Sequence, residues 1–326
     1  MILVTGGGGF IGSNLVNALI KKNYKTAICD YKYSINEHYF ENYKNIYALV
    51  EPKEIEEFIN KNNIKFIIHL GAISSTTCYD GNKLWLNNIF FSSKIWKICC
   101  KKNIRLIYAS SAATYGDGKK GFIDKEDLSY LNSLVPLNIY GWTKNEIDKR
   151  IIFSDKFLNI KPPQWVGLKF FNVYGPNEFH KNNMKSIVLK IYEQIMRNET
   201  SYLFKSHNPN YQDGEQKRDF IYVKDCINIL LWFMDNYKKS GIFNVGTGQS
   251  RTFNDLIKSV YINMKKNINL EYIDMPNKIK NQYQYETKAE MNKLIDAGYN
   301  NKLFTLEEGV KDYLESYLKK KDNAIS

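Results

Sequence analysis

The sequence predicts an α/β fold built on a doubly wound parallel sheet, and two observations carry this prediction. Short, fully apolar runs alternate with longer stretches that have apolar residues at helical spacing, a pattern typical of parallel strands joined by helices. The chain has 326 residues, 44% hydrophobic and 25% charged, which suits a protein with a sizeable core. We expect a first domain over residues 1–170 and a smaller lobe over 171–326, part of whose chain returns to the first domain.

The predicted elements alternate regularly through the first half of the chain. Expected strands cover residues 2–5, 26–30, 65–70, 105–110 and 165–172, each apolar at its centre. Expected helices cover residues 10–22, 52–62 and 82–102, and a long one begins near Tyr140 and runs past Arg150. After Gly175-Pro176 the chain is richer in loops, and residues 208–216 are especially polar. Further helices are expected near residues 186–197, 224–237, 253–266 and 306–320.

The net charge of +12 comes from 46 Lys and Arg against 34 Asp and Glu. Only five of these cations are arginines, and the lysines are spread along the chain in ones and twos. A protein that reads nucleic acid favours arginine, which pairs bidentately with guanine and phosphate. We therefore interpret the charge as mainly solvated surface and expect no nucleic-acid partner, although a functional role for it stays an alternative.

Several other classes of protein and site are not expected. No apolar run approaches the roughly 20 residues that cross a bilayer, and the opening Met-Ile-Leu-Val-Thr-Gly lacks the regions of a secretory signal. We therefore expect a cytoplasmic protein without a membrane partner. The five cysteines show no Cys-x-x-Cys spacing and the four histidines form no cluster, so neither a disulfide framework nor a metal site is predicted.

A glycine cluster links the first predicted strand to the first predicted helix. Gly6, Gly9 and Gly12 follow the spacing Gly-x-x-Gly-x-x-Gly, which permits a tight turn, the approach of a pyrophosphate to the backbone, and close packing of helix on strand. The phosphates then meet the free N–H groups of the helix N-terminus. In this strand–turn–helix context the motif predicts a dinucleotide cofactor on a Rossmann-type sheet.

Asp30 ends the second predicted strand, where an acidic side chain accepts the hydroxyl groups of the adenosine ribose. A carboxylate there favours NAD because it repels a 2′-phosphate. Lys32 follows two residues later and would offset that repulsion, so the residues leave NAD and NADP open.

Tyr140 and Lys144 are four residues apart in the predicted long helix and therefore share one helix face. A neighbouring ammonium stabilises a phenolate and brings the tyrosine pKa from about 10 toward neutral pH. Lys144 can also bind the nicotinamide ribose. Ser111, at the end of a hydroxyl-rich strand, would hydrogen-bond the reacting oxygen. Asn87, on the helix after the third predicted strand, could hydrogen-bond back to the loop that passes under the cofactor, although a surface position is the commoner one for an asparagine.

Motifs in order along almost the whole chain resemble the extended short-chain dehydrogenases/reductases of the nucleotide-sugar epimerase and dehydratase group. Besides Tyr140-Gly-Trp-Thr-Lys144, they lie at residues 71–77 with Asp80-Gly81, 108–116, 171–176 with His180-Lys181, 217–223, 241–248 and 282–284. The Ser-Ser-Thr-Thr and His-Lys segments separate the chain from the commoner UDP-sugar 4-epimerases. They resemble the members of the group that act on an ADP-linked heptose.

The resemblance implies an isomerase that inverts C6″ of an ADP-heptose through a transient keto intermediate, to supply heptose for the lipopolysaccharide core. It implies acid–base groups on both faces of the reacting carbon, Tyr140 on one and Lys181 on the other, since burial lets an amine shed its proton. It further implies NADP as cofactor with NAD as the alternative, an ADP-sugar substrate, and a homo-oligomer, by resemblance a pentamer.

The remaining site residues are carried over from the family one position at a time. Those expected to bind the cofactor are Gly6, Gly9, Phe10, Ile11, Gly12, Asp30, Tyr31, Lys32, Lys53, Leu70, Gly71, Ala72, Ile73, Ser74, Asn87, Lys144, Val173 and Lys181. Those expected to bind the substrate are Ser111, Asn172, Asn183, Lys190, Phe204, Lys205, Ser206, His207, Arg218 and Tyr283, with Arg218 as a clamp for the diphosphate. The chain departs from the family pattern at Asn183, at Lys190 and in the longer loop 208–216.

Two other functions are weighed against this one. A different nucleotide-sugar epimerase, dehydratase or reductase, such as a UDP-sugar 4-epimerase, would turn over UDP- or GDP-sugars and would keep its activity in Lys181→Met. A non-catalytic regulator that senses a dinucleotide would tolerate loss of the Tyr/Lys pair. The presence of Ser111, Tyr140 and Lys144 together favours an enzyme.

Overall fold

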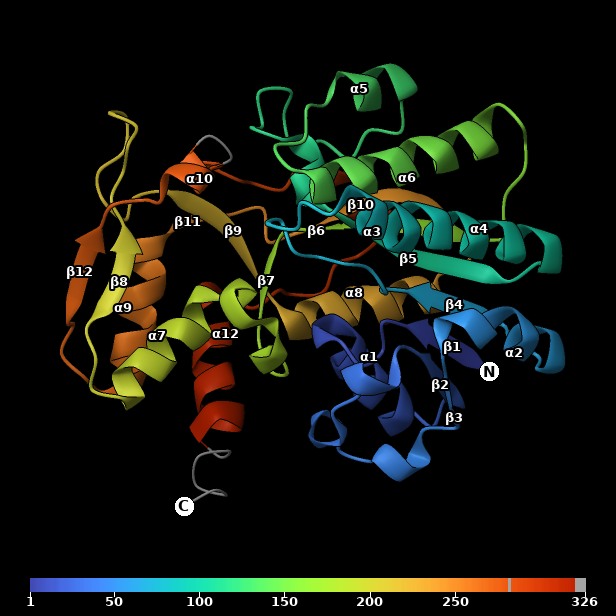
Figure 1. Ribbon diagram of the computed structural model, residues 1–326, viewed down its shortest axis with the longest axis horizontal. Coiled ribbons are helices and arrows are strands. Elements are labelled where there is room, and N and C mark those ends of the chain that lie inside the picture. Colours follow the sequence, from blue (N-terminus) through green and yellow to red (C-terminus); the bar gives the residue numbers. More distant parts are fainter. Residues whose placement is uncertain (281–282, 320–326) are drawn as a thin grey trace.

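Short strands, all largely buried except the edge strand β3, form a seven-stranded parallel sheet in the order β10-β6-β5-β4-β1-β2-β3 (Figure 1). The computed structural model describes residues 1–280 and 283–319, without the side chains of residues 182, 183 and 278. The strands of this sheet are β1 (Ile2–Thr5), β2 (Thr26–Cys29), β3 (Ala48–Val50), β4 (Phe66–His69), β5 (Arg105–Ser111), β6 (Trp165–Phe170) and β10 (Gly241–Val245). The predicted α/β fold with a parallel sheet is confirmed.

Alternate side chains of each strand enter two separate cores, one on each face of the sheet. In β1, Ile2 and Val4 pack in the core that α1 (Phe10–Lys21) and α8 (Val223–Asp235) cover. Leu3 points the other way, into the core below α2 (Ile55–Lys61), α4 (Phe91–Lys102) and α6 (Ile139–Lys156). The helices therefore sandwich the sheet, with α4 and α6 side by side above it in Figure 1.

The direction of winding reverses between β1 and β4. From β1 the sheet continues to β2 and β3 on one side and to β4, β5, β6 and β10 on the other. At such a switch point the loops after the two strands diverge and leave a crevice at their carboxyl ends. The glycine turn after β1 and the loop after β4 both open into this crevice.

The C-terminal lobe carries two small sheets and most of the remaining helices, at the left of Figure 1. One sheet pairs β8 (Ser201–Phe204) with β12 (Leu270–Ile273), and the other has the order β11 (Ser250–Thr252), β9 (Lys217–Tyr222), β7 (Asn172–Tyr174). Around them lie α7 (Ile187–Met196), α9 (Phe253–Met264), α10 (Asn277–Lys280) and α12 (Leu306–Tyr313), while α11 (Asn292–Asp296) contacts β10. The chain from 171 onward also contributes α8 and β10 to the central sheet and its cover.

The structure differs from the predicted elements at several places, and the predicted helix 52–62 is divided into the 3₁₀ turn η4 (Pro52–Glu54) and α2. The predicted strand 165–172 ends at Phe170, because a bend closed by the Val173 N–H and the Phe171 carbonyl (2.9 Å) sends the chain into β7. The predicted helix 82–102 is divided into α3 (Gly81–Leu84), the π-helical turn η5 (Trp85–Phe90) and α4. The predicted helix 306–320 continues α12 as the π-helical turn η8 (Leu314–Leu318), and residue 320 lies outside the described residues.

Three short helices, α5 (Leu128–Ser133), α10 and α11, were not predicted from the sequence. Of these, α5 lies nearest the catalytic helix, α6. The Asp127 side chain caps the N-terminus of α5 by accepting from the Tyr130 N–H at 2.8 Å. In the described ranges, no helix has the length and apolar character that a membrane crossing requires.

Candidate active site

A cavity of about 1040 Å³ opens at the carboxyl ends of β1, β4 and β5, at the upper end of the range usual for ligand sites. It is lined by Ser111 and Tyr140 and by most of the residues predicted to bind a cofactor: Gly6, Gly9, Phe10, Ile11, Gly12, Asp30, Tyr31, Leu70, Gly71, Ala72, Ile73, Ser74, Asn87, Lys144, Val173 and Lys181. Residues from both ends of the crevice and from the chain after β7 thus meet in one space.

The glycine turn and the start of α1 form a cradle for phosphate groups. Gly6 has φ +67°, and a Cβ on it would lie 2.6 Å from Gly71 Cα, so only glycine lets the two loops pass this closely. Within the described chain, no side chain caps α1 at its N-cap residue, Gly9. The free N–H groups of this helix end face the cavity and favour an anion. The cradle fits the pyrophosphate of a dinucleotide.

The carboxylate of Asp30 closes the adenosine end of the cradle. Its Oδ2 accepts from the Gly8 N–H at 3.0 Å and its Oδ1 accepts from the Tyr31 N–H at 2.9 Å. Burial raises the pKa of Asp30, and these two backbone hydrogen bonds oppose that rise. The carboxylate is therefore held in one orientation toward the space where an adenosine ribose would lie.

Lys32 and Lys53 do not line the main cavity. The Lys53 ammonium pairs with Glu51 at 3.1 Å, and its side chain is 75% exposed. Lys32 is exposed and borders a small adjoining hollow together with Asp30 and Glu51. Two lysines and two carboxylates therefore share the region beside the predicted ribose position.

Asn88, rather than Asn87, binds the loop that follows β4. Asn88 is fully buried in the π-helical turn, accepts from the Ile73 N–H at 2.9 Å and donates to the Ile73 carbonyl at 3.0 Å. Its amide also donates to Thr143 of α6 at 3.1 Å. Asn87 faces the cavity and accepts from the Tyr31 hydroxyl at 3.4 Å. The hydrogen bond to the loop that the sequence offered for Asn87 is made by Asn88 instead, because the wider π-turn brings Asn88 to the inner face.

His69 joins the ends of β1 and β4 to α4. Its Nδ1 lies 2.6 Å from Thr5 Oγ1 and its Nε2 lies 2.8 Å from Ser92 Oγ. Burial and, to a smaller extent, the Lys144 charge lower the pKa of His69 to about 3. The ring is therefore neutral at physiological pH and acts as a polar bridge beneath the cavity.

Tyr140, Lys144 and Ser111 lie together at the end of β5. Lys144 is 4% exposed, its Nζ donates to the Ala109 carbonyl at 2.8 Å, and it lies 6.0 Å from the centroid of the Tyr140 ring. Burial lowers the pKa of Lys144 to about 8, and the Asp148 charge opposes this. Burial raises the pKa of Tyr140 above its usual value, and the hydrogen bond with Ser111 opposes that rise only in part. The predicted shift of this pKa toward neutral pH is therefore wrong for this structure. The expected juxtaposition of hydroxyl, phenol and ammonium is present.

Lys181 enters the same cavity from the 3₁₀ turn η7 (Phe179–Met184). Its Nζ lies 5.0 Å from the centroid of the Phe10 ring. Burial lowers the pKa of Lys181, whereas the charge of Glu178 raises it. His180 also lines the cavity and contacts the Tyr39 hydroxyl through its Nδ1 at 3.2 Å.

Part of the predicted substrate set forms a separate cluster in the lobe. The Arg218 guanidinium is 7% exposed, and its Cζ lies 5.0 Å from the centroid of Tyr283. The His207 ring lies 6.3 Å from Tyr283 and bonds Tyr285 through Nδ1 at 2.8 Å. Gln284 donates to the carbonyl of Gly116, so this segment contacts the catalytic side of the sheet.

The other predicted substrate residues are more dispersed. Phe204 ends β8, Lys205 pairs with Asp274 at 3.4 Å, and the Ser206 N–H donates to Asp213 at 2.7 Å. Lys190 lies on α7 within electrostatic range of Lys181 and Glu178. Asn172 is exposed and accepts from Thr287 at 3.5 Å. The side chain of Asn183 lies outside the described part of the structure.

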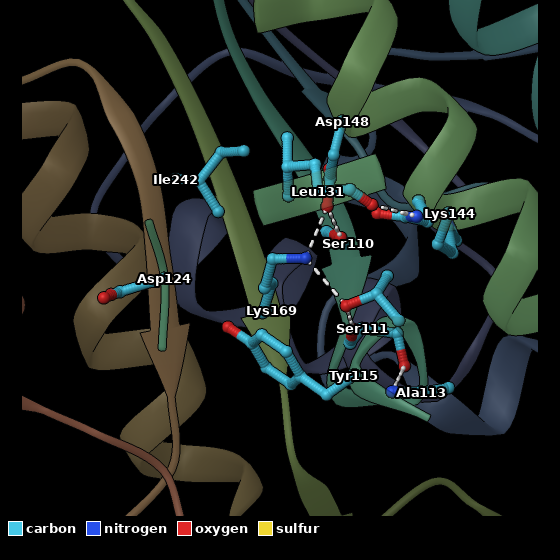
Figure 2. A network of polar contacts seen from close by, with 12 residues as sticks. Ser110, Ser111, Ala113, Tyr115, Asp124, Leu131, Lys144, Asp148, Lys169 and Ile242 are labelled. Carbon is cyan, nitrogen blue, oxygen red and sulfur yellow. Dashed lines mark hydrogen bonds and ion pairs between the residues drawn. The ribbon is translucent and has the colours of Figure 1, made fainter. Parts of the chain in front are cut away.

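Four further polar residues support the site and were not named from the sequence: Asn88, Asp148, Lys169 and Glu178. Asp148 of α6 and Lys169 of β6 form a buried ion pair between this helix and this strand (Figure 2). Lys169 is a charged residue inside an apolar strand, and Asp148 is one helical turn from Lys144. Both positions could therefore have been recognised in the sequence as polar residues near the site. Across the described residues no group of His, Cys, Asp and Glu could hold a metal ion.

Proton transfer beside a bound dinucleotide is the chemistry that this arrangement of groups supports, which defines the class as a dinucleotide-dependent enzyme. The chain belongs to the NAD dependent epimerase/dehydratase family, whose sequence model matches residues 2–246. The family and the cavity together support a nicotinamide dinucleotide as cofactor.

Curated relatives cover the full length of the chain. An ADP-L-glycero-D-manno-heptose-6-epimerase of Fusobacterium nucleatum subsp. nucleatum is 42% identical over 100% of both chains. A protein of the same name from Brachyspira hyodysenteriae is 36% identical over 97% of each. These relatives confirm the family predicted from the sequence motifs.

Solved structures agree with the fold. A crystal structure of ADP-L-glycero-D-manno-heptose-6-epimerase from Helicobacter pylori aligns with TM-score 0.78 and 28% identity over 97% of this chain and 95% of that one. A UDP-N-acetylglucosamine 4-epimerase of Methanobrevibacter ruminantium M1 aligns with TM-score 0.83 over 98% of both chains at 23% identity. At that identity the second match shows a shared fold alone.

Proposed function

We propose that this protein is an isomerase that converts ADP-D-glycero-D-manno-heptose to ADP-L-glycero-D-manno-heptose by inverting C6″. One observation carries the proposal beyond the names of the relatives: proton-transferring groups reach the cavity from opposite faces of the sheet. Tyr140 comes from α6, whose apolar face packs in the core on one side of the sheet. Lys181 comes from η7, whose Phe179 packs against the core on the other side. An inversion in which the C6″ oxygen is served from each side in turn needs acid–base groups on both faces of this carbon.

A nicotinamide dinucleotide in the cradle would supply the acceptor and donor of the hydride. The chain's own residues then manage protons and orientation. Tyr140 takes a proton from, or returns one to, the C6″ oxygen, and the buried Lys144 ammonium stabilises its phenolate form. Ser111 hydrogen-bonds the same oxygen and orients it. Lys181 performs the matching proton transfer for the opposite configuration, since its lowered pKa makes the free amine accessible.

The ADP group of the substrate would lie against the lobe. Arg218, buried and held over the Tyr283 ring, presents a guanidinium suited to a diphosphate. His207 lies beside Tyr283 and offers a flat surface for the base. Asn172 and Lys190 lie on either side of Lys181 in the chain, and we assign them to the sugar.

For the cofactor we propose NADP, as the family resemblance implies, with Lys32 as the group nearest a 2′-phosphate. NAD is the second candidate because of one observation: the Asp30 carboxylate, fixed by Gly8 and Tyr31, faces the same ribose position. Mass spectrometry of the dinucleotide released from purified, denatured protein decides between them. NADP is supported if the wild type releases NADP and Lys32→Ala no longer retains it. NAD is supported if only NAD is released.

We further propose that the enzyme works in the cytoplasm as a homo-oligomer. The adjoining helical segments of η5 and α6 expose large apolar side chains, with Trp85 at 44% and Trp142 at 42%. Such side chains are more typical of a protein interface than of free surface. Light scattering of the purified protein measures the assembly, and a pentamer is the form the resemblance implies.

A substrate panel tests the proposed function against its nearest alternative. The purified protein is incubated separately with ADP-D-glycero-D-manno-heptose, UDP-glucose and UDP-N-acetylglucosamine, and each sugar is analysed by NMR. We expect epimerisation of the ADP-heptose and none of the UDP-sugars. Turnover of a UDP-sugar that survives in Lys181→Met would instead establish a 4-epimerase, and activity that survives in Tyr140→Phe would remove the catalytic assignment.

A further inference from the structure

A buried ion pair joins α6, the helix that carries Tyr140 and Lys144, to the strand β6. Asp148 of α6 and Lys169 of β6 are both fully buried, and Lys169 Nζ lies 2.6 Å from Asp148 Oδ2. Asp148 follows Lys144 by four residues and Tyr140 by eight, so the three share one face of the helix. Neither member of the pair lines the cavity. Any effect on the reaction must therefore act through other residues.

The carboxylate of Asp148 holds the carboxyl end of β5. Its Oδ1 accepts from the Tyr108 hydroxyl at 3.0 Å and its Oδ2 accepts from the Ser110 hydroxyl at 2.7 Å. These two residues point to the same side of the strand because side chains alternate along it. The carbonyl of Ala109, between them, accepts from Lys144 at 2.8 Å. Helix α6 thus holds three consecutive residues just before Ser111.

The ammonium of Lys169, on the neighbouring strand β6, holds Ser111 in place through Thr114. Lys169 Nζ donates to Thr114 Oγ1 at 2.7 Å, and that hydroxyl donates to the Ser111 carbonyl at 2.8 Å. Figure 2 shows Lys169 between Asp148 above it and the turn that carries Ser111 and Ala113 below it. The ion pair thereby connects the backbone of Ser111 to the helix that carries Tyr140 and Lys144.

The pair also determines the local charge. Titratable groups near the Tyr140–Lys144 pair lie on the surrounding elements: Asp148 on the same helix, His69 on β4, Tyr108 on β5, Lys169 on β6 and Lys181 across the cavity. Behind them, Glu126 acts on Tyr108 and Asp124 acts on Tyr115. Among them Asp148 lies on the same helix face, and its charge raises the pKa of both Tyr140 and Lys144. Lys169 offsets that charge through direct contact.

We propose that Asp148 and Lys169 are positioning residues for the epimerisation: together they fix Ser111 relative to Tyr140 and Lys144 and keep the charge beneath these groups balanced. This rests on the proposed function for the identity of the reaction. A purely stabilising role explains the pair poorly, because apolar residues of similar volume usually replace a buried ion pair with little loss of stability.

Single substitutions move the Tyr140 titration in opposite directions. Asp148→Asn leaves the buried cations unbalanced and lowers the phenol pKa, whereas Lys169→Met leaves the carboxylate unbalanced and raises it. A unit charge a few ångström away in a medium of effective dielectric about 20 shifts a pKa by about one unit or more. The measurement is a pH titration of cofactor-loaded protein labelled with ¹³C at tyrosine Cζ, in which the signal absent from Tyr140→Phe identifies Tyr140. It requires no substrate.

The double variant Asp148→Asn/Lys169→Met separates charge from position, and it stays informative if an unpaired buried charge unfolds a single variant. Its net charge is unchanged, so Tyr140 should titrate as in the wild type. Loss of the links to Ser111 should still reduce kcat roughly 10- to 100-fold, the size expected for a small misplacement of reacting groups. The KM for the ADP-heptose should stay within about twofold, because neither residue touches the substrate.

A matched control exists in the lobe. Asp312 accepts from Lys224 at 2.6 Å and from the Tyr222 hydroxyl at 2.7 Å, so Asp312→Asn breaks the same kind of contact away from the cavity. It should leave the Tyr140 titration and kcat unchanged. Shifts of the same sign in both single variants, or a wild-type kcat in the double variant, would overturn the proposal. If the wild type does not epimerise the ADP-heptose, the proposed function fails, while the ¹³C titrations still test the charge relationship.

Discussion

The backbone N–H of Lys181 donates to the carbonyl of Glu178 at 3.1 Å, and the buried Glu178 side chain organises the segment on both sides of it. Glu178 Oε1 accepts from the Ser186 hydroxyl at 2.6 Å and from the Gly175 N–H at 3.3 Å. Its Oε2 accepts from the Ser186 N–H. One carboxylate thus closes the loop 175–186 that carries Lys181 into the cavity.

Glu178→Gln should impair the reaction through Lys181. The amide removes the charge that raises the pKa of Lys181, so the limb of the pH–rate profile that reports this amine should move to lower pH. The amide nitrogen also replaces an acceptor, and we expect kcat to fall about tenfold or more. Glu199→Gln, at an exposed glutamate, should match the wild type. A profile that moves to higher pH would contradict the assignment.

Gly6→Ala should remove the cofactor. A Cβ on Gly6 would lie 2.6 Å from Gly71 Cα and 2.8 Å from the carbonyl carbon of Leu70, at φ +67°. The left-handed conformation and the overlap together cost about 2–4 kcal/mol, and the cradle must open to relieve it. Absorbance at 260 nm and mass spectrometry of the purified protein measure the bound dinucleotide. In Gly81→Ala, where a Cβ meets no atom within 4 Å, dinucleotide content should be unchanged; equal retention in both variants would argue against the cradle.

His69 should make the protein sensitive to acid. Its pKa is about 3 in the folded chain and about 6.5 when unfolded, so below pH 6.5 only the unfolded state takes up this proton. The free energy of unfolding should then fall as pH is lowered toward 3, by at most about 1.4 kcal/mol per pH unit for this one group. Denaturant unfolding between pH 5 and 7 measures the slope. His69→Gln should have a shallower slope, and His38→Gln, at an exposed histidine, should keep the wild-type slope.

Arg218→Lys should weaken substrate binding more than turnover. The planar guanidinium binds a diphosphate through two oxygens, whereas an ammonium binds as a point charge. Loss of one charged hydrogen bond costs about 1.5–3 kcal/mol, so the KM for the ADP-sugar should rise about tenfold or more. Steady-state kinetics provide the measurement, with Arg197→Lys at an exposed position as the control. An unchanged KM would place the diphosphate elsewhere.

Local patterns were sufficient to predict the sheet and its cofactor turn. The apolar run at residues 2–5 and the glycines that follow it define β1, the cradle and the start of α1 from neighbouring residues alone. The spacing of Tyr140 and Lys144 likewise places two side chains on one helix face. Asn172 was misplaced because a bend at Phe171, closed by one backbone hydrogen bond, is invisible in an apolar stretch.

The supporting residues depend on contacts distant in sequence. Lys169 meets Thr114 across 55 positions, and Asn88 meets Thr143 across the same separation. Nothing in the sequence near Lys181 shows that it reaches the cavity; it was named through the family resemblance alone. Glu178 is close to Lys181 in the chain, but its burial and its contact with Ser186 follow from how the loop folds back.

The conversion of ADP-D-glycero-D-manno-heptose by purified protein, followed by NMR at C6″, tests the central claim most directly. Wild type, Tyr140→Phe and Lys181→Met are assayed in parallel, with bound dinucleotide quantified in each sample. We predict that the wild type produces the L-glycero epimer and that each variant retains its dinucleotide but loses nearly all epimerisation. A wild-type protein that holds its dinucleotide and leaves the ADP-heptose unchanged, or a Lys181→Met variant that epimerises it at the wild-type rate, would contradict a two-sided inversion at C6″.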